Sequence, residues 1–297
     1  MKSHAAPLAG STLFSDLAEL TKPRITLMVA ITTAAGFLLA AQGTPLDLLR
    51  LAHTLIATAL LSAGACALNQ VVERDSDARM RRTASRPLPA GRLDPDTGLL
   101  WGVLLVVGGL VYLALSVNLL TALLGASTVA LYVFAYTPLK RVSSLSTLVG
   151  AVPGAVPPVM GWTAVRDQLD PGAWALFAIL FLWQLPHFLS IAWLYREDYA
   201  RGGFPMLPVD DPGGRRTALQ MLLYGGALVP VSLLPSPLGL VGMTYLAGAL
   251  LLGLGYFAAC VVFARRRSES AARRLLLASV AYLPALLAVM LVDRLLG

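Results

Sequence analysis

Charged residues are scarce in this sequence. Asp, Glu, Lys and Arg make up 13% of its 297 residues, whereas hydrophobic residues make up 57% and the mean hydropathy is +0.72. A soluble globular domain carries about 25% charged residues, so this composition excludes one. Hydrophobic runs recur along the whole chain, which predicts one domain of several membrane-spanning helices.

Cysteine is scarcer still. The sequence contains two, Cys66 and Cys260, and both lie in apolar runs without the spacing of a metal site. This excludes a disulfide framework, and we expect two buried free thiols.

The first 20 residues lack the continuous apolar core of a cleaved secretory signal. Asp16 and Glu19 interrupt this segment. We therefore expect a flexible N-terminal tail over residues 1–20, followed by a single polytopic domain over residues 21–297.

The hydrophobic runs define nine candidate spans, each long enough to cross the apolar core of a bilayer, some of them with tilt. They cover residues 24–42, 51–72, 98–116, 119–137, 145–164, 173–194, 217–235, 238–263 and 275–295. The predicted fold is an all-α membrane protein with nine transmembrane helices. In the fifth span, Gly150, Gly154 and Gly161 would let neighbouring helices approach closely.

The connecting loops differ in charge from one side of this arrangement to the other. One side carries 20 of the 23 Lys and Arg residues, and the other carries Arg50, Arg166 and Arg294. Because positive charge collects in cytoplasmic loops, this asymmetry supports the count of nine and predicts a cytoplasmic N-terminus and a C-terminus on the opposite side. The net charge of +7 is thus mostly a topology signal, and we predict no binding to nucleic acid.

A polar row ends the second span. Asn69, Glu73 and Asp77 are spaced four residues apart, so on a helix they share one face over roughly 12 Å. Oxygen ligands at a membrane surface suit a hard cation such as Mg²⁺. Polar groups phased at the end of a span mark a site more often than they are incidental.

Two long loops on the cytoplasmic side mix carboxylates with arginines. They cover residues 73–97 and 195–216, and two shorter basic stretches, Lys22-Pro-Arg24 and Lys140-Arg141, fall on the same side. Carboxylates that hold Mg²⁺, together with Arg and Lys that hold phosphate oxygens, would bind a diphosphate. Any single arginine beside a span can equally be a topology anchor.

His187 stands inside the sixth span, in the stretch Trp183-Gln-Leu-Pro-His187. Pro186 frees a backbone carbonyl there and bends the helix, as happens at binding sites in membrane helices. The histidine can donate a hydrogen bond to a neighbouring helix, act as an acid or base, or bind iron. These alternatives stay open.

These residues together resemble the intramembrane aromatic prenyltransferases, and among them the family of the protoheme IX farnesyltransferases, or heme O synthases. Asn69-x3-Glu73-x3-Asp77 is similar to the first acidic motif of the wider superfamily, with Glu in place of the middle Asp. The other resembling stretches are Leu20-Thr-Lys-Pro-Arg-Ile-Thr26, Arg82-Thr-x-x-Arg86-Pro-Leu88, Tyr136-Thr-Pro-Leu-Lys-Arg141, Gly154-Ala-Val-Pro-Pro-Val-Met-Gly-Trp162, Trp183-Gln-Leu-Pro-His187-Phe and Asp198-Tyr-Ala-Arg-Gly-Gly-Phe-Pro-Met-Leu-Pro208. The second acidic motif of the superfamily appears here as Tyr195-Arg-Glu197-Asp198-Tyr199, with tyrosines about where acids would stand, as in the heme branch.

The resemblance implies helices around a central cavity that opens to the cytoplasmic side of the plasma (inner) membrane. It implies farnesyl diphosphate as donor, heme B as acceptor, heme O as product and, as a further partner, a heme A synthase. The implied Mg²⁺ ligands are Asn69, Glu73 and Asp77, joined by Glu197 or Asp198. The implied contacts to diphosphate or heme propionates are Lys22, Arg24, Arg82, Arg86, Lys140 and Arg141. His187 is implied to bind heme iron or to orient a water molecule.

Other functions are compatible with parts of the sequence. A prenyltransferase of the same fold could act on a quinone precursor or on chlorophyllide, but His187 and the tyrosine-substituted second motif favour heme. A transporter would distribute polar residues through the bilayer midplane, whereas here they gather at one face. A CDP-alcohol phosphotransferase would need an Asp-x2-Asp-Gly run, which the sequence lacks.

Overall fold

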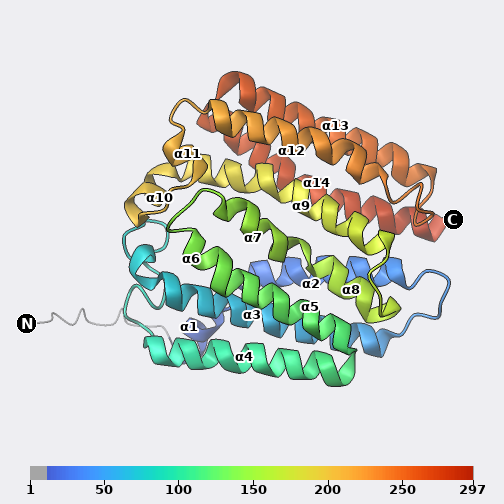
Figure 1. Cartoon of the computed structure of the whole chain (residues 1–297), viewed down its shortest axis with the longest axis horizontal. Helices are drawn as coiled ribbons and strands as arrows, with labels where there is room; N and C mark the ends of the chain where they lie inside the picture. The colour runs from blue at the N-terminus through green and yellow to red at the C-terminus, as the bar shows by residue number, and fades with distance from the viewer. Residues whose placement is uncertain (1–11, 297) are drawn as a thin grey trace, which may run out of the picture.

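The computed structural model describes residues 12–296, and within that range the chain is helical without a β-strand (Figure 1). The first half contains α1 (Leu13–Leu20), α2 (Pro23–Ala40), α3 (Leu48–Asp77), α4 (Pro95–Ser116), α5 (Leu119–Ala130), the π-helix η1 (Leu131–Tyr136) and α6 (Thr137–Leu139). The second half contains α7 (Ser146–Ala155), α8 (Pro157–Arg166), α9 (Pro171–Leu194), α10 (Arg196–Gly202), α11 (Leu207–Asp210), α12 (Arg215–Leu233), α13 (Met243–Arg266) and α14 (Glu269–Leu296).

The long helices run side by side between two ends of the molecule (Figure 1). Among the described residues, eight segments are long and apolar enough to cross a membrane, which confirms an all-α, multi-pass membrane protein. The predicted fifth span is built from α7 and α8 in succession. The predicted seventh span corresponds to α12, which begins with Arg215 and Arg216 and is not among the eight, so the count of nine stays a prediction.

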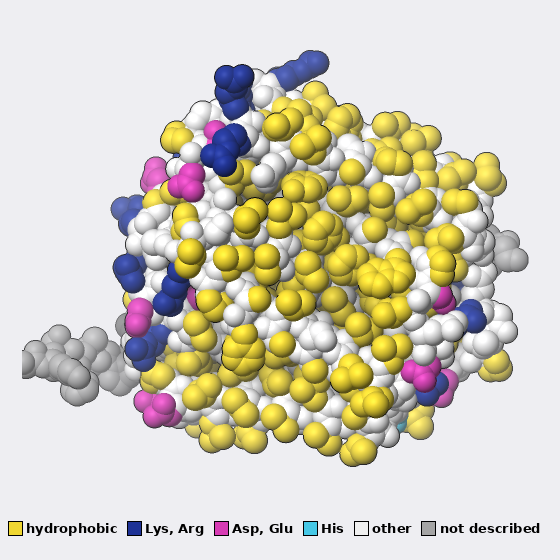
Figure 2. All heavy atoms as spheres, viewed as in Figure 1, with side chains coloured by type: hydrophobic (Ala, Val, Ile, Leu, Met, Phe, Trp, Pro, Cys, Tyr) yellow, Lys and Arg dark blue, Asp and Glu magenta, His cyan; other side chains and the backbone are white. Residues whose placement is uncertain are grey.

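The surface separates apolar from charged side chains. Figure 2 shows hydrophobic side chains over the middle of one face, and Lys, Arg, Asp and Glu side chains gathered mainly at the end where Figure 1 places α1, α10 and α11. Large apolar side chains such as Leu115, Phe134 and Leu251 are mostly exposed. Such a surface is stable against lipid tails and unstable against water.

Residues 1–20 were expected to form a flexible tail, but the described part of that segment is ordered. Residues 1–11 lie outside the described residues, whereas Leu13–Leu20 form α1, whose N-terminus is capped by the Thr12 side chain. Arg92 pairs with Asp16 at 3.0 Å and with Glu19 at 2.6 Å. The N-terminal cap and these ion pairs stabilise α1, which is too short to be stable as an isolated helix.

Glycines bring α2 and α8 into backbone contact. A Cβ atom added at Gly161 would lie 1.9 Å from the carbonyl oxygen of Thr33, and one added at Gly36 would lie 2.0 Å from that of Pro158. Gly154 is similarly close to the Gln184 side chain on α9. The expected close helix approach at the fifth span is confirmed, and it holds α2 against α8.

Candidate active site

The last turns of α3 carry the predicted polar row into a buried position. Asn69, Glu73 and Asp77 are 2%, 2% and 1% exposed. Their spacing of four residues places them on one face of the helix, as the sequence predicts. Carboxylates buried to this degree need compensating partners, and each of the three residues has one.

Three cations from three different segments meet this row. The Lys140 Nζ lies 3.0 Å and 3.1 Å from the two carboxylate oxygens of Glu73. The Arg86 Nη1 donates to Asp77 Oδ2 at 2.6 Å. Lys22 Nζ donates to Asn69 Oδ1 at 3.4 Å. The structure therefore brings together the whole predicted acidic row and three of the six predicted cations.

The two lysines of this cluster have different electrostatic surroundings. Burial lowers the pKa of Lys22 below its ordinary value, since its nearest polar partner is the neutral amide of Asn69. Burial also acts to lower the pKa of Lys140, but the neighbouring Tyr136 and the carboxylate of Glu73 outweigh it, and the pKa of Lys140 is raised. Lys140 therefore stays a cation, and Lys22 gains most from a further anionic partner.

The backbone at Lys22 is strained. Its φ of 47° and ψ of 67° lie in the left-handed region, which costs an ordinary residue about 1–2 kcal/mol. The backbone N–H of Lys22 donates to the carbonyl of Glu19 in α1, so the docking of α1 holds this conformation. This left-handed conformation turns the chain sharply between α1 and α2. It brings the Lys22 side chain within hydrogen-bond distance of Asn69.

The π-helix η1 contributes a partner that the sequence analysis missed. Thr137 follows η1 directly, accepts from the Asn69 Nδ2 at 3.1 Å and donates to the Tyr132 carbonyl at 2.7 Å. A π-turn widens the helix and is frequent at functional sites. In the sequence, Lys140 and Arg141 mark this stretch as basic. No pattern in Tyr136-Thr-Pro-Leu-Lys140 predicts a π-helix before it.

Aromatic rings enclose the cationic side of the cluster. The Lys140 Nζ lies 4.7 Å from the ring centre of Phe204 and 5.7 Å from that of Tyr136. The Arg82 guanidinium lies over Tyr195 at 5.3 Å and over Tyr199 at 6.0 Å. The two tyrosines of the second motif thus act as cation–π partners of Arg82, a contact that the sequence analysis did not predict.

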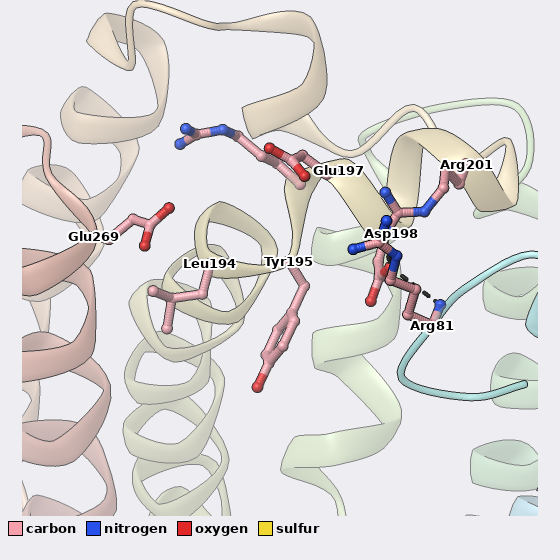
Figure 3. A pocket seen from close by; sticks show the side chains of 8 residues that line it. Arg81, Leu194, Tyr195, Glu197, Asp198, Arg201 and Glu269 are labelled. Atoms are coloured by element: carbon pink, nitrogen blue, oxygen red, sulfur yellow. Dashed lines mark hydrogen bonds and ion pairs between the residues drawn. The ribbon is translucent and has the colours of Figure 1, made fainter. Parts of the chain in front are cut away.

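Among the described residues, Asp198 and Glu197 form no metal-holding group with the acidic row. Asp198 accepts from the backbone N–H of Arg81 at 3.2 Å and of Arg82 at 3.4 Å, and it pairs with the Arg201 side chain. Glu197 is exposed and lines a pocket of about 190 Å³ at the end of α9 (Figure 3). Their role as metal ligands stays a prediction. In this structure Asp198 joins α10 to the loop that carries Arg82 and Arg86.

The hydrogen bonds to Asp198 predict a pH-dependent stability. Burial opposes ionisation, but Arg201 and the two backbone amides outweigh it, so the pKa of Asp198 lies below its ordinary value. A lowered carboxyl pKa adds stability above about pH 4, and this is lost as the pH falls through the folded-state pKa. We expect Asp198→Asn to lower the unfolding temperature at pH 7, with the difference from the unmodified protein narrowing below about pH 4.

Thermal unfolding in detergent across this pH range measures that difference. Asp75→Asn is the matched control, because Asp75 forms an exposed ion pair with Arg74 and such pairs contribute little. An equal effect of both substitutions at pH 7 would contradict the role assigned to Asp198.

The remaining predicted cations lie outside the cluster. Arg24 is exposed at the start of α2, and Arg141 is exposed and donates to the Val72 carbonyl at 2.7 Å. Arg82 faces the tyrosines described above rather than the carboxylates. His187 lies separately on α9, where its Nδ1 contacts the Ser279 hydroxyl of α14 at 2.7 Å.

The acidic row fits a hard divalent cation in its chemistry. Within residues 12–296 no group of three or more His, Cys, Asp or Glu side chains is arranged to hold a metal. The row itself contains two carboxylates, and these pair with Lys140 and Arg86. The Oδ1 atom of Asp77, however, is buried and has no hydrogen-bond partner among these residues. An unsatisfied carboxylate oxygen beside the oxygens of Asn69 and Glu73 is a donor set that Mg²⁺ prefers.

Comparison with known proteins shows which family this chain resembles. The model of the UbiA prenyltransferase family matches residues 29–282. The chain is 52% identical over 290 residues to the protoheme IX farnesyltransferase of Solibacter usitatus, covering 94% of this chain and 98% of that protein.

Two solved structures share the fold at low sequence identity. A digeranylgeranylglyceryl phosphate synthase structure superposes with a TM-score of 0.77 at 16% identity, covering 96% of this chain and 99% of that one. A UbiA homolog from Archaeoglobus fulgidus, bound to GPP and Mg²⁺, superposes with a TM-score of 0.66 at 17% identity, covering 93% of this chain and 99% of that one. The chain belongs to the UbiA prenyltransferase family.

Proposed function

We propose that this protein transfers the farnesyl group of farnesyl diphosphate to a vinyl group of heme B, with addition of water, and so makes heme O and diphosphate. The observation that carries the proposal is the buried row of Asn69, Glu73 and Asp77, matched by Lys22, Lys140 and Arg86 at the charged end of a membrane bundle. The name and the identity of the Solibacter relative support the choice of substrates.

Loss of the diphosphate is the difficult step, since the C1–O bond breaks and its electron pair leaves with the phosphate. Cations held where this charge develops lower the barrier, and a buried site strengthens their effect. Lys22 is the cation best placed to transfer to phosphate, because its present partner is an uncharged amide. Arg82, held over Tyr195 and Tyr199, is a second such group.

Asn69, Glu73 and Asp77 would hold Mg²⁺, as the unsatisfied Oδ1 of Asp77 indicates. When bound, Mg²⁺ would neutralise the charge that develops on the leaving diphosphate. In this structure, Lys140 and Arg86 neutralise the same carboxylates. We therefore expect these two side chains to shift from carboxylate to phosphate when the donor binds.

The carbon skeleton reacts in the apolar part of the protein. The farnesyl cation is allylic and is trapped quickly by water, so the apolar surroundings have to delay that trapping. The terminal carbon of the heme vinyl group attacks C1 of the farnesyl group. The cation that forms next to the porphyrin ring takes up water and releases a proton, which yields the hydroxyethylfarnesyl side chain.

The bilayer placement follows from the same charges. The charged end that carries the site is expected to face the cytoplasm across the plasma (inner) membrane, with the N-terminus on that side and the C-terminus on the other. A basic rim there attracts both the diphosphate and the heme propionates. Both substrates have apolar bodies and anionic ends, and a heme A synthase is the expected recipient of the product.

A product assay tests the proposal. Purified protein in detergent is given heme B, farnesyl diphosphate and Mg²⁺, with and without EDTA, and the hemes are analysed by liquid chromatography and mass spectrometry. We expect a heme heavier by one farnesyl group and one hydroxyl group, absent with EDTA and restored by excess Mg²⁺. Diphosphate release with unmodified heme would overturn the acceptor, and turnover that persists in EDTA would overturn the metal.

A further inference from the structure

His187 belongs to a hydrogen-bond chain that links α9 to α14 inside the bundle. The Ser279 hydroxyl lies 2.7 Å from the His187 Nδ1 and donates to the Leu276 carbonyl at 2.6 Å. A serine hydroxyl carries a single proton. With its proton directed at Leu276, the oxygen of Ser279 accepts from His187, and this arrangement assigns the ring proton to Nδ1.

Trp183 holds the same pair from the other side. Its ring stacks on His187 at 5.2 Å between centroids with a 23° angle, and its Nε1 donates to the Ser279 carbonyl at 2.8 Å. The carbonyl of Trp183 accepts in turn from the Tyr256 hydroxyl at 3.0 Å. The ring of His187 is thereby held by the Trp183 ring of α9 and the Ser279 hydroxyl of α14.

The other ring nitrogen is left without a partner. Nε2 of His187 makes no hydrogen bond to any residue in the range 12–296, and the side chain is only half-buried. A doubly protonated ring would leave an N–H at this position unsatisfied at membrane depth, which is costly. Nε2 therefore presents a lone pair.

The position of His187 on α9 places it between the contacts of that helix with α14 and with α7. Trp183 faces α14, and Gln184, about 100° further around the helix, donates to the Ala151 carbonyl of α7 at 2.7 Å. His187, about 40° from Trp183, lies between these two contacts. Helix α2, which begins beside Lys22 of the site, packs against both α9 and α14.

We propose that Ser279 is a positioning residue: by accepting the Nδ1 proton it fixes the His187 tautomer whose Nε2 binds the iron of the heme acceptor. The inference rests on the proposed function for its ligand and deepens it by choosing iron ligation for His187. An imidazole whose Nδ1–H is hydrogen-bonded is the usual form of a metal-binding histidine, and the hydrogen bond raises the basicity of the ligating nitrogen.

The tautomer is measured first, without heme. Protein labelled with ¹⁵N-histidine is examined by NMR in detergent, and the His187 signals are assigned by their absence in His187→Gln. We expect a protonated Nδ1 and an unprotonated Nε2, changing to a tautomer mixture in Ser279→Ala. A protonated Nε2 in the unmodified protein would overturn the proposal, whatever the outcome of the product assay.

Ferric heme B is then titrated into the same proteins. We expect visible and electron paramagnetic resonance spectra of imidazole-ligated heme, lost in His187→Gln, and an affinity about tenfold weaker in Ser279→Ala. Ser190→Ala is the matched control, since Ser190 is equally buried and also donates to a helix carbonyl, that of Pro186. Equal heme affinity in Ser279→Ala and Ser190→Ala would contradict the role of Ser279, and imidazole-ligated spectra in His187→Gln would contradict ligation by His187.

Discussion

Glu73→Gln is expected to reduce kcat/KM for farnesyl transfer by about 10²- to 10³-fold, which is typical for the loss of one preorganised charge at a developing anion. The carboxylate is 2% exposed and holds Lys140 through both oxygens. The amide cannot neutralise the lysine or serve as an anionic ligand of Mg²⁺. The product assay under saturating Mg²⁺ measures the effect.

Two further variants separate chemistry from folding. Breaking a buried ion pair costs about 3–5 kcal/mol, so Glu73→Gln is also expected to unfold more easily. Glu73→Gln combined with Lys140→Met removes the unpaired charge, and should regain stability while activity stays low. Glu19→Gln makes the same chemical change in the half-exposed pair with Arg92 and should leave activity within twofold. Recovery of activity in the double variant would show that Glu73 serves the fold alone.

Gly161→Ala is expected to destabilise the fold by about 3 kcal/mol, because the added methyl group would overlap the backbone of a neighbouring helix. The new Cβ would lie 1.9 Å from the Thr33 carbonyl oxygen, a backbone atom that cannot rotate away. Helices α2 and α8 would have to separate, and α2 carries Lys22 at its N-terminus. Thermal unfolding in detergent, with size-exclusion chromatography to follow the folded fraction, measures the loss.

Gly255→Ala supplies the comparison for this substitution. Gly255 lies in α13, is exposed, and has no atom within 4 Å of an added Cβ. Because alanine stabilises a helix interior relative to glycine by about 0.5–1 kcal/mol, this variant should unfold at the same temperature or higher. If both variants unfold alike, α2 and α8 do not cross at backbone contact.

The helices and the acidic row were predictable because both depend on local order in the chain. Runs of apolar residues set the spans, and a spacing of four residues sets one face of a helix, whatever the rest of the chain does. The positive-inside pattern added the grouping of Lys22, Arg86 and Lys140 at one end. In the structure, each of these three side chains contacts a different residue of the acidic row.

The partners beyond that row depend on contacts between distant segments, which spacing does not encode. The sequence predicts Asp198 as a metal ligand because it stands in the second acidic motif. In the structure its oxygens accept hydrogen bonds from backbone amides more than 110 residues away along the chain. Nothing in the sequence distinguishes Ser279 from other serines in helices. Only the packing of α14 against α9 brings its hydroxyl to His187. Residues 13–20 were predicted to be part of a flexible tail. Arg92, which stabilises them as a helix by pairing with Asp16 and Glu19, comes more than 70 residues later in the sequence.

The π-helix η1 has a consequence for the tolerance of this site to insertions and deletions. A π-turn holds one residue more than the α-helical turn that it replaces, so the extra residue is accommodated while the residues that follow keep their phase. In a continuous α-helix the same extra residue would rotate Thr137 and Lys140 by about 100° about the helix axis. Removing one residue from Leu131–Tyr136 would therefore close the segment into an α-helix with Thr137 still facing Asn69. Adding one residue would turn Thr137 and Lys140 away from the acidic row, so this segment is expected to tolerate a deletion of one residue better than an insertion.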